Sequence, residues 1–229
     1  MTKKYEFTGE VETLLDGTIV RQIRATRDIF VGGIVIAAGT LGGMIEGEDN
    51  LAQTGECWVS GDACVAGRAR VTGSAWVSGA ARVAGDARVA GHAVVGGLAV
   101  IDGGAWVGGR ATVVGFAHVG GRATIEGAAR VTGHAVVNCE AVISGRARVE
   151  DSGRVCGAAR ISGRARVYGQ AWVNECAVVN GAAVVSGRAM VTGRARVGGD
   201  AYVFADAQVR GKARVRGDAR VGGWTTVAE

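Results

Sequence analysis

Apolar and polar positions alternate along most of this chain with a period of six residues. From Val59 to Val227, every sixth residue is Val or Ile, 29 positions in all. From Val65 onward the residue two places before each of them is Ala, Gly153 and Thr225 being the departures. Successive side chains of a strand point to opposite faces, so Ala and the branched residue share one face of a short strand. The residues between and after them face outward.

Glycine stands two residues after most of the branched positions, as in the unit Ala-Arg-Val-Thr-Gly-Ser at 69–74. Glycine makes sharp corners because it adopts backbone angles that a side chain would penalise. A six-residue period with such corners is typical of a hexapeptide-repeat parallel β-helix, in which three hexads complete one triangular coil. We therefore predict an all-β fold of about ten triangular coils around a narrow apolar interior. The chain contains no proline, which a continuous ladder of hydrogen bonds would exclude.

The first part of the chain lacks the six-residue period. It alternates instead, as in 18–23 and 33–37, which predicts short strands joined by Gly and Asp turns. A β-helix leaves unpaired strand edges at its ends, and an added segment commonly covers one of them. The predicted organisation is a small N-terminal β cap over residues 1–56, followed by the hexapeptide-repeat β-helix over residues 57–229.

The junction between these parts carries a family resemblance. Residues 39–51, then Gly55 and the pair Trp58-Val59, resemble the YdcK-type hexapeptide-repeat proteins of enterobacteria, phages and prophages, and 21–23 (Arg-Gln-Ile) matches their N-terminal segment. Met44 replaces the Trp, and Ala52 the Ser, that the family pattern leads us to expect. The resemblance implies a left-handed β-helix, which the period alone does not determine. The acyltransferase label often given to such proteins rests on fold analogy.

Charge is spread unevenly between the two parts. Residues 1–50 carry 5 − 8 = −3 and the remainder carries 21 − 13 = +8, so the β-helix is the basic part. No apolar run reaches the length of a signal peptide or a membrane span, and we expect a bacterial cytoplasmic protein. The cysteines form no CxxC pair, so we expect reduced thiols rather than disulfides or zinc ligands. We expect no metal and no cofactor.

Sorting the hexads by their place in an 18-residue coil brings five arginines together. Arg130, Arg148 and Arg166 occupy equivalent positions on one face of successive coils, and Arg146 and Arg164 lie on the adjoining corner. We call these five residues the first arginine patch. Guanidinium forks suit phosphate, and Tyr168 on the same face is placed to stack on a base or sugar. The alternative is a solvated face in which Arg is simply part of the repeated unit.

A second cluster of basic residues lies near the C-terminus, tempered by Asp200 and Asp218. This second basic patch consists of Arg194, Arg196, Lys212, Arg214 and Arg216. Aromatic residues do not interleave with the arginines as they do in strand-binding platforms, so a small phosphorylated ligand fits the sequence better than long nucleic acid.

Apolar residues at outward positions predict self-association, because exposed apolar patches mark partner surfaces. One group is Leu98, Val114 and Phe116, and another is Tyr202, Phe204 and Trp224. The last coil ends at 227–229 without a covering helix, so its strand edges favour a partner. We expect a homo-oligomer, either a lateral trimer or an end-to-end dimer.

Catalytic groups are hard to find in this sequence. Hexapeptide acyltransferases use a histidine base and a loop that reaches the neighbouring prism, yet no loop interrupts the repeats here. His92, His118 and His134 occupy outward positions on different coils, with no carboxylate at an obvious orienting position. Cys64 and Cys156 are also predicted to face outward without a histidine nearby, although Arg154 is expected to lower the pKa of Cys156. We predict no catalytic residue.

Three functional hypotheses remain. The first is a non-enzymatic binding protein of phage or prophage type whose arginine patches hold a small phosphorylated anion, one use being the sequestration of a nucleotide signal of host defence. The second is an acyltransferase of the hexapeptide type. The third is a passive structural or virion component.

Overall fold

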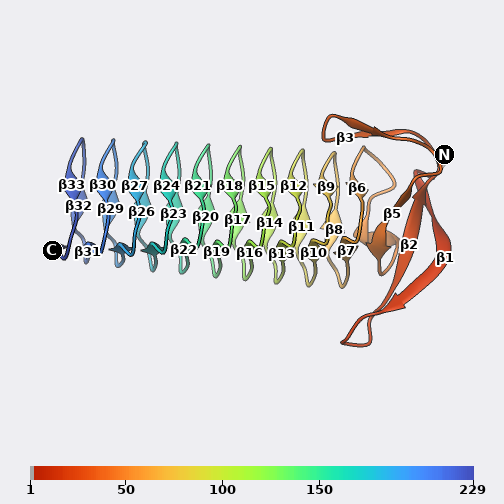
Figure 1. Cartoon of the computed structure of the whole chain (residues 1–229), viewed down its shortest axis with the longest axis horizontal. Helices are drawn as coiled ribbons and strands as arrows, with labels where there is room; N and C mark the ends of the chain where they lie inside the picture. The colour runs from red at the N-terminus through yellow and green to blue at the C-terminus, as the bar shows by residue number, and fades with distance from the viewer. Residues whose placement is uncertain (1–2) are drawn as a thin grey trace.

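The computed structural model describes residues 3–229, an elongated parallel β-solenoid with a small β cap at its N-terminal end (Figure 1). Across these residues the coils number about ten, as the sequence predicts, and no α-helix occurs. No helix in this range is long and apolar enough to cross a membrane. The hexapeptide-repeat fold is confirmed, while its handedness stays a prediction.

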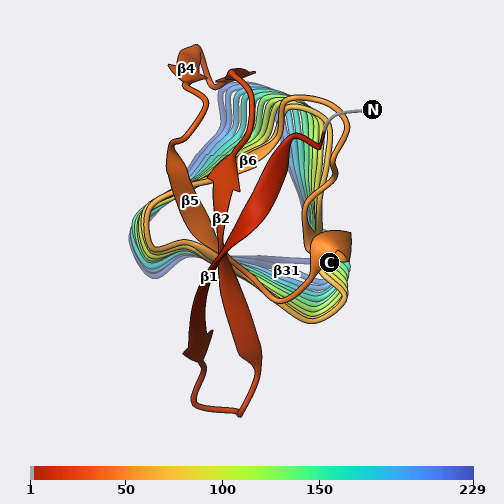
Figure 2. The ribbon, with the colours of Figure 1, turned by 90° about the vertical axis from the view of Figure 1, so that its right-hand side faces the viewer.

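Three parallel sheets form the sides of the solenoid in the described chain, and seen along the axis the coils superimpose as a triangle (Figure 2). Sheet I contains β7 (Cys64–Val65), β10 (Arg82–Val83), β13 (Val100–Ile101), β16 (His118–Val119), β19 (Val136–Val137), β22 (Arg154–Val155), β25 (Trp172–Val173), β28 (Met190–Val191), β31 (Gln208–Arg210) and β34 (Thr226–Ala228). Sheet II contains β8 (Arg70–Val71), β11 (Arg88–Val89), β14 (Trp106–Val107), β17 (Thr124–Ile125), β20 (Val142–Ile143), β23 (Arg160–Ile161), β26 (Val178–Val179), β29 (Arg196–Val197) and β32 (Arg214–Val215). Sheet III contains β6 (Trp58–Val59), β9 (Trp76–Val77), β12 (Val94–Val95), β15 (Thr112–Val113), β18 (Arg130–Val131), β21 (Arg148–Val149), β24 (Arg166–Val167), β27 (Val184–Val185), β30 (Tyr202–Val203) and β33 (Arg220–Val221).

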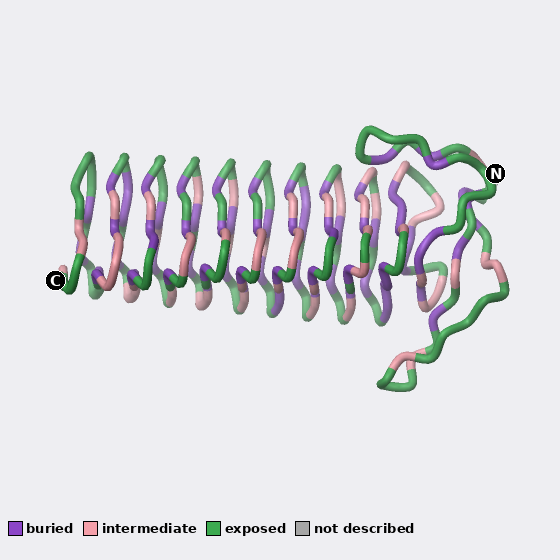
Figure 3. Tube along the Cα trace, in the orientation of Figure 1, coloured by how far each residue is buried: buried purple, intermediate pink, exposed green. Residues whose placement is uncertain are grey.

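The interior is built from the two repeating inward positions. Ala147 and Val149 are fully buried, and the same holds for equivalent residues along the whole column until the last coils. Burial of each valine contributes about 1.5 kcal/mol or more, offset largely by the entropy of ordering the chain. Figure 3 shows the result, with buried and exposed positions alternating in every coil.

Corners between the sheets have positive φ and are mostly glycine. Within residues 3–229, the non-glycine residues with positive φ are Cys139, Asp151, Glu175 and Ala205. Asn138 and Asn174 accept hydrogen bonds from the next backbone N–H at 2.6 and 2.7 Å, which stabilises the corners at Cys139 and Glu175. Ala205 has no side-chain polar group that could compensate its φ of 56°.

The cap consists of two hairpins. In one, β1 (Tyr5–Thr13) pairs antiparallel with β2 (Ile19–Ala25), which pairs with β5 (Leu41–Ile45). β5 then pairs parallel with β7, so these strands extend sheet I beyond the solenoid. Parallel stacking therefore starts ahead of the domain boundary predicted at residue 57.

The second hairpin, β3 (Ile29–Val31) with β4 (Ile34–Ile36), lies against the end of sheet III. At its turn, Gly32 contacts Trp76 so closely that a Cβ there would come within 2.5 Å of the indole. A single 3-10 turn, η1 (Glu48–Asn50), completes the first coil. Both hairpins thus hold the N-terminal end of the solenoid.

A buried lysine lies inside this cap. Lys4 is fully buried, and its Nζ donates hydrogen bonds to the carbonyl oxygen of Cys57 at 2.9 Å and to Cys57 Sγ at 3.1 Å. Burial lowers the pKa of Lys4 from its ordinary value of 10.5, because the charged form loses its hydration.

Replacing Ala205 by glycine should stabilise the protein by about 1 kcal/mol, because a left-handed conformation costs an L-residue about 1–2 kcal/mol that glycine does not incur. Ala182→Gly is the matched control, since Ala182 is exposed and has no positive φ. Thermal unfolding should give a higher midpoint for the first variant and a lower one for the second. Destabilisation by both substitutions would contradict the corner argument.

The buried lysine should make the stability of the cap depend on pH. Between the lowered pKa of folded Lys4 and 10.5, the unfolded state binds more protons, so stability rises with pH through that window. Lys4→Met removes this contribution. Urea unfolding at neutral pH and near pH 10 should show the wild type gaining stability relative to the variant at the higher pH. Equal pH slopes would show that Lys4 is not held in a dehydrated site.

Candidate anion-binding site

The first arginine patch forms as the sequence predicts. Arg130 pairs in register with Arg148, and Arg148 with Arg166, on neighbouring strands of sheet III. Arg146 and Arg164 lie at the corner that precedes the same strands, and all five side chains are exposed. Like charges at such spacing repel unless an acid lies between them.

Glu150 supplies that acid. Its carboxylate lies 2.9 Å from Arg166 Nη2 and 3.7 Å from Arg148 Nη1, so it bridges the two guanidinium groups. Arg166 also lies over the ring of Tyr168, 5.1 Å from its centroid. Glu150 therefore pairs with two of the five arginines and offsets one of their positive charges, and a phosphate would have to compete with it for Arg166 in particular.

Tyr168 also takes part in a hydrogen-bond network across sheet III. Its hydroxyl lies 3.3 Å from that of Tyr202, to which Ser186 donates a hydrogen bond of 3.1 Å. The bond from Ser186 lowers the pKa of Tyr202, while the contact with Tyr202 raises the pKa of Tyr168. The tyrosines line an open pocket of about 450 Å³ whose other walls are Arg166, Val184, Asp200, Asp218 and Arg220.

The second basic patch differs from the first because it is not compensated. Within the described residues, none of its five side chains forms an ion pair with a carboxylate at 4.0 Å or less. Asp200 and Asp218, which the sequence suggests as tempering acids, line the tyrosine pocket on sheet III instead. Arg196 and Arg214 are paired in register on sheet II, so two exposed cations are held side by side.

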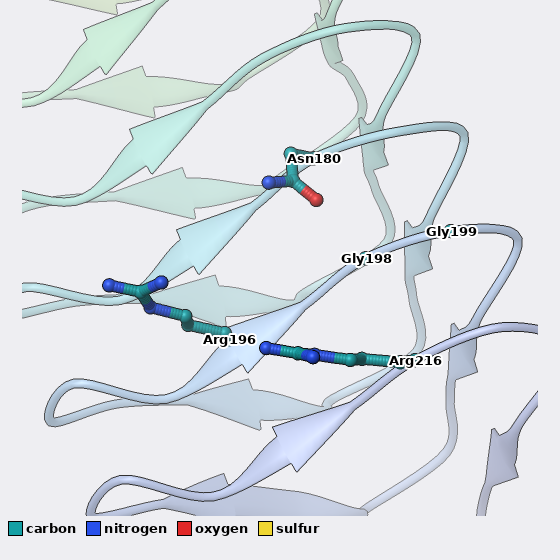
Figure 4. Close-up of a pocket in the computed structure, with 5 residues that line it drawn as sticks. All are labelled: Asn180, Arg196, Gly198, Gly199 and Arg216. Carbon is teal, nitrogen blue, oxygen red and sulfur yellow. The ribbon is translucent and has the colours of Figure 1, made fainter.

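A shallow pocket of about 260 Å³ opens within this patch (Figure 4). Arg196 and Arg216 project in the same direction from neighbouring coils, with Asn180 on the coil before them. Gly198 and Gly199 complete the lining. A Cβ at Gly198 would collide with Asn180 Oδ1, so the absence of a side chain there keeps the pocket open. The site therefore offers two guanidinium forks, an amide and accessible backbone.

The residues predicted for an oligomer interface lie on one side of the solenoid. Leu98 and Phe116 are about half exposed, Trp224 is 83% exposed, and Phe116 stacks on His134 with centroids 4.7 Å apart. Val114 is half-buried. Tyr202 and Phe204 stack on each other, with Arg220 over both rings, so their faces are already engaged within the chain. The interface stays a prediction.

One histidine does have an orienting carboxylate, contrary to the sequence-based expectation. His118 Nε2 lies 2.9 Å from Asp102 Oδ2, and both side chains are partly exposed on sheet I. Val100 is the strand neighbour of His118, and Asp102 follows it by two residues on the same outer face. The pairing was missed because the acid precedes the histidine by almost a full coil.

Asp102 also borders a pocket of about 290 Å³ beneath the tip of the β1–β2 hairpin. Leu14 packs against Cys64 at this pocket, and Leu15, Arg82 and Val100 are also among its lining residues. Cys64 lies on the outer face of sheet I, as predicted, but the hairpin covers this position and buries the thiol. Burial also raises its pKa. The tip of the β1–β2 hairpin lacks the six-residue period, so the sequence does not predict which strands it covers.

Arg154 lowers the pKa of Cys156, as expected, but the net shift of this thiol is upward. Partial burial raises the pKa of this thiol, and the lowering by Arg154 is the smaller effect. All five cysteines are free. No group of three or more metal-ligating side chains occurs in the part of the chain that the structure describes.

Comparison with known proteins bears on the repeat. Residues 159–175, which include β23, β24 and β25, match the family model of the YdcK beta solenoid repeat. No curated protein matches the chain. Together with the stacked coils, the match means that this chain is a parallel β-solenoid protein that carries the YdcK beta solenoid repeat.

Proposed function

We propose that this protein is a non-enzymatic binding protein that holds a small phosphorylated anion on its second basic patch. The supporting observation is the pocket between Arg196 and Arg216, which lies among cations that form no ion pair with any carboxylate of residues 3–229. A phosphate there would gain bidentate hydrogen bonds from planar guanidinium groups.

The arrangement of the patch favours a small ligand. The pocket is open and its cations are exposed, so binding should be weakened strongly by salt. Asn180 can donate to or accept from a neutral part of the ligand. The bare backbone at Gly198 lets the ligand approach the sheet closely.

The first arginine patch is a secondary contact in this proposal. Arg130, Arg146 and Arg164 form no ion pair in the structure of residues 3–229, whereas Arg148 and Arg166 share Glu150. A multiply charged phosphate ester could displace Glu150, but that exchange reduces the net gain. We therefore place the primary site on sheet II and the weaker one on sheet III.

The biological setting belongs to the same proposal. The YdcK resemblance suggests a phage or prophage protein of the bacterial cytoplasm, and the exposed apolar residues near Phe116 and Trp224 suggest a homo-oligomer. Several equivalent sites on one oligomer would suit sequestration of a nucleotide signal of host defence.

The double variant Arg196→Ala with Arg216→Ala should bind inorganic pyrophosphate about tenfold or more weakly. The reason is that hydrogen bonds to charged groups contribute about 1.5–3 kcal/mol each. Isothermal titration at low ionic strength measures this change. The matched control is Arg70→Ala with Arg88→Ala, which removes the same charge from neighbouring strands at the other end of sheet II. Equal losses in both double variants would reduce the effect to general charge and contradict a local site.

Filling the pocket provides a second test that leaves every charge in place. Gly198→Asn puts a side chain into the pocket of the second basic patch. Gly198 does not have a positive φ, so the fold should tolerate the substitution once the Asn180 side chain shifts. Pyrophosphate binding should fall about tenfold as in the arginine variant, with an unchanged thermal midpoint. Full retention of affinity would mean that the ligand does not use this pocket.

A second candidate function is acyl transfer, favoured by the His118–Asp102 pair beside an apolar pocket. A carboxylate that orients an imidazole is the arrangement that general-base catalysis needs. The pocket beneath Leu14 and Leu15 could shelter an apolar chain, with Arg82 available for an anionic group.

For this second candidate, release of coenzyme A from acetyl-CoA should be lost in His118→Ala and reduced about a hundredfold in Asp102→Asn, in line with the usual contribution of a positioned base. His134→Ala is the control, since the His134 ring stacks on Phe116 and pairs with no carboxylate of residues 3–229. Turnover that is absent from the wild type with a range of amine and hydroxyl acceptors would rule out this candidate and leave the binding protein.

A further inference from the structure

The pair of Lys4 and Cys57 has chemistry that neither the fold nor the anion site requires. The amine nitrogen and the thiol sulfur are 3.1 Å apart, and both residues are fully buried. No carboxylate of the described residues pairs with Lys4, so its charge is uncompensated at short range. A methionine would fill the same space without a buried polar group.

The two residues join different parts of the molecule. Lys4 precedes β1 in the cap, and Cys57 precedes β6 in the first regular coil. Gln53 accepts a hydrogen bond of 2.8 Å from the backbone N–H of Lys4, which fixes the lysine backbone next to the coil. Any bond between the side chains would therefore tie the cap to the solenoid.

Among the hydrogen-bond partners of the Cys57 thiol in residues 3–229, the side-chain amine of Lys4 is the one nucleophile. Cys57 Sγ lies near the carbonyl oxygens of Val71 and Ala52, at 3.5 and 3.6 Å, and neither oxygen can attack an oxidised sulfur. Cys64 lies beneath the β1–β2 hairpin on the outer face of sheet I, in a separate cluster. Burial favours the neutral amine of Lys4, which carries the lone pair that a nucleophile needs.

We propose that Lys4 and Cys57 are a peroxide-responsive cross-linking site that forms an N–S bond, a sulfenamide, between cap and solenoid. A peroxide first oxidises the thiol to a sulfenic acid, with its O–O bond cleaved and one water released. Lys4 Nζ then attacks the sulfur, the S–O bond breaks, and the hydroxyl leaves as water with a proton from the nitrogen. Sulfur has lost two electrons and the peroxide has gained them.

Burial determines the order of these steps. Peroxide reaches the thiol when the cap opens locally, as low-stability segments do, and closing returns the amine to the sulfur. The closed cap excludes other thiols, so condensation with Lys4 outcompetes disulfide formation. A small thiol reverses the bond in the open state by attacking sulfur, which releases the amine and leaves a mixed disulfide that a second thiol reduces.

Peptide mass spectrometry after treatment of the whole protein with hydrogen peroxide tests the proposal. The expected product is one species joining the Lys4 and Cys57 peptides, lighter than their sum by two hydrogen atoms and lost on addition of dithiothreitol. Oxidation in concentrated urea should lower its yield about tenfold or more, because only the fold holds the two groups together. Equal yields in urea, or Cys57 oxidised to sulfinic acid without a link, would overturn the proposal.

Two matched variants separate this site from its neighbours. Lys3→Met should leave the cross-link intact, since Lys3 is exposed and pairs with Glu48, whereas Lys4→Met should abolish it. Cys64→Ser should also leave it intact. Persistence of the link in Lys4→Met would assign it to another amine and refute the pairing. The wild-type comparison with and without urea remains decisive even if the Lys4 variant folds poorly.

Discussion

Stacking of one coil on the next through a parallel hydrogen-bonded ladder is the interaction on which the whole molecule depends. Every coil presents the same inward pair, Ala and a branched residue, to the coil above and below, so Val149 packs beneath Val167 in strict register. An insertion of one residue within a strand would turn the inward side chains that follow it outward unless a corner looped the extra residue out. The uninterrupted period from Val59 to Val227 is the sequence counterpart of that constraint.

The constraint leaves the outer surface free to vary. Outward positions carry Arg, Trp, Val, Thr, His or Tyr in the same backbone setting, and the ladder is unchanged beneath them. Function must therefore be encoded in the columns of outward residues, and columns differ most clearly in whether their charges are compensated. On sheet III, Glu150 pairs with both Arg148 and Arg166, whereas on sheet II no acid within residues 3–229 pairs with Arg196 or Arg214.

The sequence predicts the neighbours of a residue within the regular coils but not within the N-terminal cap, because only the coils have a fixed register. The 18-residue coil places Arg130, Arg148 and Arg166 correctly, because parallel register converts sequence distance into spatial neighbours. The same register also predicts the His118–Asp102 pair. Val100 is the partner of His118 on the preceding coil, and Asp102 lies two residues after Val100. The burial of Cys64 had no such signal, because the hairpin that covers it has no repeat register. The pairing of Lys4 with Cys57 was hidden for the same reason.

In the function that we propose, a basic column without a paired acid in residues 3–229 holds a small phosphorylated anion on the outside of the solenoid. Native mass spectrometry of protein purified at low ionic strength tests it most directly, because one spectrum reports both the subunit count and any retained ligand. We expect an oligomer with added mass in integral ratio to its subunits, lost after a high-salt wash and restored by pyrophosphate. An oligomer of bare subunit mass that also fails to take up pyrophosphate would contradict it.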